Sequence, residues 1–201
     1  MKYKALITLF TLAAMAGSVQ AAGNAAAGKA KSQVCFSCHG VNGNSTNPVW
    51  PKLAGQHGKY IAKQLADFKT NKRTEPLMIA QVMNLSDQDM ADIGAFFAKQ
   101  KASMGSADEK KLALGQRIYR GGNPASGVSA CIACHGPTGI GNPGANFPLL
   151  SGQHTAYVVK ALKDFRSGAR ANDQNQMMRA VAGKMTDAEI EAVASYVSGL
   201  H

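Results

Sequence analysis

A pentapeptide of the form Cys-x-x-Cys-His occurs twice in this chain and constrains its possible folds more than any other feature. The thiols and imidazoles belong to Cys35, Cys38 and His39 in the first copy, and to Cys131, Cys134 and His135 in the second. This spacing is the attachment signal for c-type haem, because two thiols add across the vinyl groups of one porphyrin and the histidine offers its imidazole to the iron. The two copies use all four cysteines. We therefore predict two covalently bound haem c groups, with no thiol left for a disulfide or a zinc site.

Two other uses of paired cysteines fit the sequence less well. Zinc ribbons separate their pairs by about 15–20 residues, whereas most of a domain lies between Cys38 and Cys131. A thioredoxin-like dithiol is expected within a βαβ unit, and no strand-like alternation surrounds either motif. Haem attachment is therefore the favoured interpretation.

The N-terminal segment has the plan of a secretory signal peptide. Basic Lys2 and Lys4 precede an apolar run from Ala5 to about Ala16, and small residues lead to Ala21. The run is short for a membrane span, and an uncleaved anchor is the alternative. We expect residues 1–21 to be a signal peptide and the mature protein to be periplasmic, since haem attachment of this kind resembles a process completed outside the cytoplasm.

The mature chain is moderately basic. Loss of Lys2 and Lys4 lowers the formal net charge from +10 to +8, and haem propionates would offset part of that charge. The remainder favours steering toward acidic redox partner proteins, or peripheral association with an anionic membrane surface. A solvated surface of dispersed lysines explains it equally well. Nucleic acid is a poor alternative, because the basic residues are dispersed and the chain carries a secretion signal. We expect a monomer.

An internal repeat divides the mature chain. The stretches Trp50–His57 and Phe147–His154 share the pattern Pro-x-Leu-x-Gly-Gln-His. Each half must therefore build its own small fold around its own haem. We assign residues 22–100 to a first haem-binding domain, residues 101–106 to a linker and residues 107–201 to a second haem-binding domain.

Both halves have the pattern of helices joined by loops rich in Gly, Pro and Asn, which predicts an all-α fold. Apolar residues at helical spacing and capping boxes indicate helices at Gly28–Val34, Tyr60–Lys69, Ser86–Ala98, Ala107–Tyr119, Tyr157–Phe165 and Thr186–Val197. Gly28 and Gly115 would let the first helix of each half approach the last helix closely, beneath Phe96 and Tyr196. The alternative is that these glycines merely dilute helix propensity.

The second axial ligand of each iron decides between electron transfer and ligand binding or catalysis. Aligning the capping boxes of the two halves places Met78 opposite Met178, the single Met–Met pair in this register. We therefore predict that these two thioethers bind iron, in loops between the middle and last helices, and that the other methionines fill the core. His57 and His154 also pair across the repeat, so bis-histidine ligation is the alternative. We expect both histidines instead at the exposed starts of helices.

The whole mature chain resembles a two-haem cytochrome c4, a tandem of class I cytochrome c domains. The Cys-x-x-Cys-His-Gly segments, the aromatic-Pro-x-Leu-x-Gly-Gln stretches and the paired methionine segments carry this resemblance. It implies two domains facing one another through a pseudo-twofold axis, with His39/Met78 and His135/Met178 as axial ligands and haem edges close enough for electron transfer. It also implies that the carbonyls of Pro51 and Pro148 accept the ring N–H of the histidine ligands. An insertion of about nine residues between Gly115 and Cys131 departs from the symmetry.

The resemblance implies a periplasmic electron carrier that passes single electrons in a respiratory chain, from a quinol-oxidising complex to a terminal oxidase. Histidine and methionine ligation suits this function, since a thioether raises the reduction potential and both faces of the iron are filled. A two-haem peroxidase or a ligand-binding sensor would need an open position at one iron. Both halves retain the paired methionine and no catalytic insertion is evident, so we expect no enzymatic activity.

Overall fold

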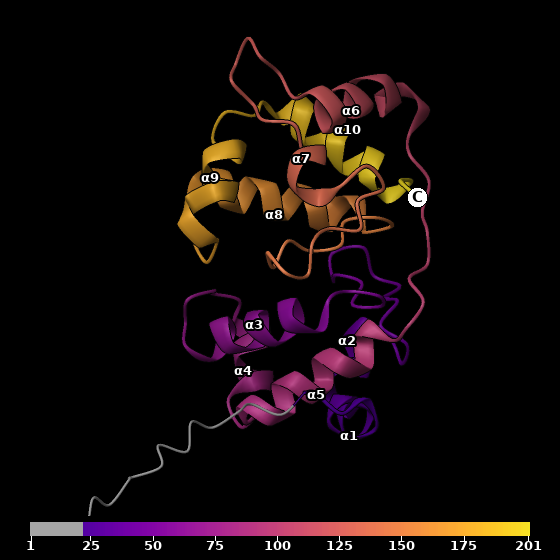
Figure 1. Cartoon of the computed structure of the whole chain (residues 1–201), viewed down its shortest axis with the longest axis vertical. Helices are drawn as coiled ribbons and strands as arrows, with labels where there is room; N and C mark the ends of the chain where they lie inside the picture. Colours follow the sequence, from indigo (N-terminus) through magenta and orange to yellow (C-terminus); the bar gives the residue numbers. More distant parts are fainter. Residues whose placement is uncertain (1–21) are drawn as a thin grey trace, which may run out of the picture.

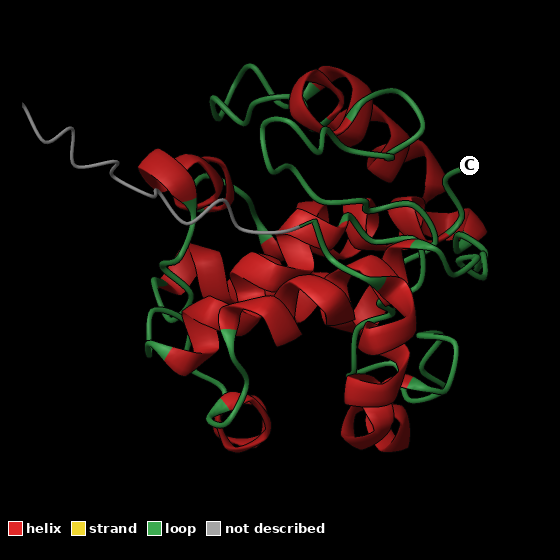
Figure 2. Ribbon diagram, turned by 60° about the horizontal axis from the view of Figure 1, so that its bottom comes forward, coloured by secondary structure: helices red, strands yellow, loops and turns green. Residues whose placement is uncertain are grey.

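The computed structural model describes residues 22–201, and the signal peptide expected at residues 1–21 lies outside the described residues. Residues 22–201 form helices and loops without a β-strand (Figure 2). Two isolated β-bridges, Asn123–Val128 and Asn142–Phe147, lie in the loops of the second half. The expected all-α fold is confirmed. Within residues 22–201, no helix is both long and apolar enough to cross a membrane.

The chain forms two halves that are stacked along the long axis of the molecule (Figure 1). The first half contains α1 (Ala25–Lys31), η1 (Ser32–Cys35), α2 (Phe36–His39), α3 (Gly58–Lys69), α4 (Pro76–Val82) and α5 (Asp87–Ala98). The second contains α6 (Glu109–Gly121), α7 (Ile132–His135), α8 (Thr155–Ser167), η2 (Gln174–Gln176), α9 (Met177–Ala182) and α10 (Asp187–Ser198). In each half the first helix and a middle helix pack on the last one, α1 and α3 on α5, and α6 and α8 on α10.

Glycine permits the close crossing of the first and last helices. A β-carbon on Gly28 would lie 1.9 Å from the Asp92 carbonyl oxygen, and one on Gly115 would lie 2.7 Å from Cβ of Tyr196. Both distances are shorter than van der Waals contact, so a larger residue would separate the helices. The expected approach beneath Tyr196 is present, whereas the contact in the first half falls on Asp92, one turn before Phe96.

Separate apolar cores lie under these crossings. Ile93 and Phe97 of α5 are fully buried in the first half, and Ile118 and Tyr119 of α6 are fully buried in the second. Local hydrogen bonds begin the last helix of each half, because Ser86 and Thr186 complete capping boxes with side chains three residues on. Each half therefore has the core and the helix starts of an independent folding unit.

The insertion before Cys131 is bound to the last helix of its own half. It turns back on itself at the Asn123–Val128 bridge, and Val128 is buried in the second core. Asn123 Nδ2 donates to Glu189 Oε1 at 2.6 Å, and Lys184 Nζ donates to the Gly127 carbonyl at 3.2 Å. The insertion thus covers the start of α10.

Buried and half-buried polar side chains connect the two halves in a crossed pattern. Arg73 donates to the hydroxyl of Tyr157 at 3.1 Å, and Arg170 donates to the hydroxyl of Tyr60 at 2.9 Å. Gln64 accepts from both arginines, at 2.9 and 3.0 Å. The same arginine–tyrosine pair is therefore made twice, once in each direction, as a pseudo-twofold axis requires.

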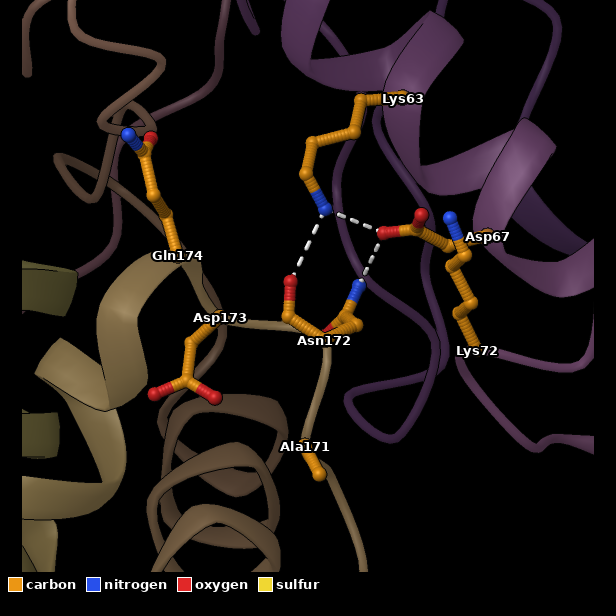
Figure 3. Close-up of a pocket in the computed structure, with 7 residues that line it drawn as sticks. All are labelled: Lys63, Asp67, Lys72, Ala171, Asn172, Asp173 and Gln174. Carbon is orange, nitrogen blue, oxygen red and sulfur yellow. Dashed lines mark hydrogen bonds and ion pairs between the residues drawn. The ribbon is translucent and has the colours of Figure 1, made fainter.

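Figure 3 shows the neighbouring part of this contact, where Lys63 and Asp67 of α3 meet Asn172 of the second half. Lys63 Nζ pairs with Asp67 and donates to the Asn172 carbonyl at 2.9 Å, while Asn172 Nδ2 donates to Asp67 Oδ2 at 2.6 Å. The halves are thus held together by directional hydrogen bonds that specify one mutual orientation.

Candidate functional site

The first candidate site is built where η1 runs into the short helix α2. This turn of chain presents Cys35, Cys38 and His39 within one turn of helix, and both thiols are free. His39 is 6% exposed, and its Nδ1 lies 2.8 Å from the carbonyl oxygen of Pro51. A carbonyl can only accept, so Nδ1 carries the proton and Nε2 keeps its lone pair. The ring is therefore oriented, and Nε2 is the nitrogen that remains available to bind a metal.

The second candidate site repeats this arrangement on α7. Cys131 and Cys134 are free, and His135 is again 6% exposed. Its Nδ1 lies 3.0 Å from the Pro148 carbonyl oxygen, and the ring of Phe147 packs 6.2 Å from the imidazole, centroid to centroid. The two histidines are therefore presented in the same tautomer by the same kind of prolyl carbonyl.

Burial sets the protonation of these groups. It lowers the pKa of His39 and of His135 below the ordinary value, and the carbonyl hydrogen bonds oppose this only in part. Both imidazoles are neutral at neutral pH, which is the form that binds a metal. Burial also raises the pKa of Cys35 and of Cys131 to about 11. These thiols differ from the low-pKa thiol of a redox dithiol, so that alternative loses support.

The paired methionines lie on short helices, where the sequence had indicated loops. Met78 is on α4, which begins at Pro76, and it packs half-buried against the same core as Cys35. Met178 is half-buried on α9. Local sequence patterns did not indicate these helices, because each has at most seven residues. Helices that short are stabilised by packing and not by helix propensity.

The other methionines divide into two groups. Met90 and Met185 fill the cores as expected, at 3% and 4% exposure. The expectation of core packing is wrong for the other three methionines, which are substantially exposed to solvent. These are Met83, Met104 and Met177.

His57 and His154 lie at the starts of α3 and α8 as their N-cap residues, as expected, but they do not face open solvent. His57 Nε2 lies 2.8 Å from the carbonyl of Ile140, and His154 Nε2 lies 2.9 Å from the carbonyl of Ser45, each in the opposite half. Both imidazoles are engaged between the halves, which leaves bis-histidine ligation with less support. Sequence reasoning also missed the glutamines that precede them, although the repeated Gly-Gln-His was a visible signal.

The side chains in each half fit haem c. Two free thiols stand beside a neutral imidazole with an available Nε2, and exposed apolar residues lie near these groups or near Met78 in the sequence, namely Val34, Val41, Leu77 and Ile140. An apolar macrocycle would cover side chains of this kind. Across residues 22–201, no three His, Cys, Asp or Glu side chains converge as metal ligands, so the ligand set of a structural zinc site is not assembled there.

Comparisons with known proteins relate this chain to cytochromes c. A family model described as cytochrome c matches residues 25–101 and again residues 112–201. Cytochrome c4 of Pseudomonas aeruginosa is 49% identical over 98% of this chain and 99% of its own length, and cytochrome c4 of Azotobacter vinelandii is 46% identical over the same shares. The crystal structure of reduced recombinant cytochrome c4 from Pseudomonas stutzeri has 47% identity and a TM-score of 0.87, covering 90% of this chain and 100% of that one.

Proposed function

Because this chain belongs to the cytochrome c4 family of dihaem electron-transfer cytochromes, we propose that it carries single electrons in the periplasm, from a quinol-oxidising complex to a terminal oxidase. Membership implies two covalently attached haem c groups, one in each half. The proposed carrier is a monomer without enzymatic activity, exported by residues 1–21. Its net positive charge supports acidic docking partners or loose attachment to an anionic membrane surface.

The axial ligands in this proposal are His39 and Met78 in the first half, and His135 and Met178 in the second. The observation that carries it is the duplicated hydrogen bond from histidine Nδ1 to a prolyl carbonyl, at 2.8 and 3.0 Å. That bond keeps Nε2 unprotonated and fixes the plane of the ring. The methionines are supported by the repeat register and by the packing of Met78 on the core that also contacts Cys35.

A haem iron held by one imidazole and one thioether supplies a one-electron couple of raised potential. The chain's own residues have a simple task under this proposal. They hold the ring nitrogens in one tautomer, surround the centre with apolar side chains and keep both axial positions filled. Electron transfer then requires little rearrangement of the protein. A peroxidase or a gas sensor would need one axial position to be open.

The test is a Met178→Ala variant of the holoprotein, with Met177→Ala as its control. Met178→Ala should remove the contribution of one haem to the far-red absorption band typical of a Met–Fe bond, and the reduced variant should bind carbon monoxide at the second haem alone. The neighbouring Met177 is exposed, and its replacement should leave both spectra unchanged. An unchanged Met178→Ala spectrum, or a wild-type protein that binds carbon monoxide readily, would overturn the proposal.

A further inference from the structure

Each half sends a buried glutamine to the backbone of the other half. Gln153 is 7% exposed; its Oε1 accepts the Lys52 N–H at 2.9 Å, and its Nε2 donates to the Lys52 carbonyl at 3.0 Å. Gln56 is 5% exposed; its Oε1 accepts the Leu149 N–H and its Nε2 donates to the Leu149 carbonyl, both at 2.9 Å. Each side-chain amide thus bonds to both the N–H and the C=O of one residue in the opposite half, and the arrangement occurs in both directions across the interface.

The backbone N–H groups that donate to these glutamines belong to the peptide units whose carbonyls accept from the candidate histidine ligands. Lys52 N–H and Pro51 C=O are the two polar ends of one peptide group. A continuous chain of hydrogen bonds therefore runs from His39 Nδ1–H through this peptide to Gln153 Oε1 in the opposite half. The matching chain runs from His135 through the Pro148–Leu149 peptide to Gln56.

We propose that each glutamine tunes the histidine ligand of the opposite half, Gln153 acting on His39 and Gln56 acting on His135. Accepting the peptide N–H polarises the peptide and places more negative charge on its carbonyl oxygen, because linked hydrogen bonds strengthen one another. The carbonyl then draws more strongly on the histidine Nδ1 proton, which makes Nε2 a stronger donor to the metal. This inference rests on the proposed function, in which the two histidines bind iron.

The glutamines are fixed in place, as a tuning group must be. Gly55 and Gly152 precede them with φ of +71° and +72°, a left-handed conformation that favours glycine and turns the next side chain toward the other half. The Gly55 N–H donates to the Phe97 carbonyl at 3.0 Å, which ties this turn to α5 of its own half. Gln56 Oε1 also accepts the N–H of His57 at 3.0 Å, and the corresponding bonds exist in the second half.

The test is a pair of holoprotein variants, Gln153→Leu and Gln56→Leu, in which the acceptor is lost and the size is nearly kept. Gln153→Leu should raise the reduction potential of the first haem alone, because a less basic imidazole stabilises ferric iron less. Gln56→Leu should raise the potential of the second haem alone. In the reduced protein, the NMR signal of the corresponding histidine Nδ1–H should move toward that of a weaker hydrogen bond in the same crossed order.

Gln64→Leu is the matched control. Gln64 is an equally buried interface glutamine that bonds to Arg73 and Arg170 and touches neither peptide, so its replacement should not produce the crossed shift. Equal shifts of both haems in every variant would reveal a purely structural role and overturn the inference. A shift confined to the haem of the mutated half, or no shift, would do the same.

A measurement on the wild-type holoprotein covers the case in which a glutamine variant fails to fold. The Lys52 and Leu149 amides should show scalar coupling through their hydrogen bonds to the glutamine side-chain carbonyl carbons, and the absence of that coupling would refute the relay. Loss of the far-red band in the wild type would instead refute the axial ligands of the proposed function. The two failures are therefore distinguishable.

Discussion

Single glycines set how closely the helices of each half approach. A β-carbon on Gly115 would lie 2.3 Å from the Ala192 carbonyl oxygen, which is backbone and cannot move aside without shifting α10. The C-terminal end of the same helix is different, because a β-carbon on Gly121 would meet no atom within 4 Å. The two glycines of α6 therefore have opposite tolerances for a side chain.

We predict that Gly115→Ala lowers the free energy of unfolding by about 1–3 kcal/mol, the usual cost of overpacking a tight contact. Gly121→Ala is the control and should be neutral or stabilising by up to about 1 kcal/mol, because alanine restricts the unfolded chain. Urea titration of the two holoproteins measures both values. Equal destabilisation by the two changes would show that the helix crossing does not constrain residue 115.

At the scale of elements, the start of α10 combines a helix cap with an anchor for the insertion. Glu189 accepts the backbone N–H of Thr186 at 2.8 Å in the capping box, and its other carboxylate oxygen accepts Nδ2 of Asn123. The corresponding box of α5, formed by Ser86 and Asp89, uses its second carboxylate oxygen differently: Asp89 Oδ1 pairs with Lys31 of α1 at 2.9 Å, and the first half has no insertion to anchor. The carboxylate of Glu189 thus both completes the cap of α10 and holds the insertion in place.

These hydrogen bonds, with that from the Thr186 backbone first, lower the pKa of Glu189 below its usual value of 4.5. Since the pKa is lower in the folded state, the stability that this carboxylate contributes is complete above the unfolded pKa. That stability is lost as the pH falls through the folded value. We predict that Glu189→Gln destabilises the holoprotein at neutral pH and that the difference from wild type shrinks as the pH is lowered below 4.5. Denaturant titration at neutral pH and at a series of pH values below 4.5 measures it. A difference independent of pH would show that the ionisation of Glu189 contributes nothing.

At the scale of the whole molecule, one asymmetric residue connects the two arginine–tyrosine pairs between the halves. Gln64 accepts from both crossed arginines, whereas the repeat places Ala161 at the equivalent position of the second half. Arg170 is 6% exposed and also stacks on Phe165, with its guanidinium carbon 4.5 Å from the ring centroid. The buried contact is therefore concentrated on a few groups whose loss would leave partners unsatisfied.

We predict that Arg170→Ala lowers the free energy of unfolding by about 1–3 kcal/mol, because buried oxygen acceptors lose a charged donor. It should also split the thermal transition into two, since the cores of the halves are separate. Scanning calorimetry resolves this, with Lys110→Ala, at an exposed position of α6, as the control. One cooperative transition at the wild-type temperature would show that the halves are coupled by other contacts.

The features best predicted from the sequence are those made by neighbouring residues. The helix expected from Ser86 through Ala98 is found as α5, Asp87–Ala98, with Ser86 as its cap. Its start is decided by hydrogen bonds over three residues. The helical setting of Met78 was missed because α4 is short and its stability comes from packing, which no local pattern records.

The sequence by itself determined the cofactor and the duplicated plan, because covalent attachment needs two thiols and an imidazole at fixed spacing and the repeat copies that spacing. Only the tertiary structure decided what lies between the halves. His57, expected at an exposed helix start, is hydrogen-bonded to the carbonyl of Ile140 in the other half. Gln153 is hydrogen-bonded to the peptide whose carbonyl holds His39. Residues that far apart in the chain meet only when two folded surfaces match in shape and hydrogen bonding, and local spacing carries no record of that match.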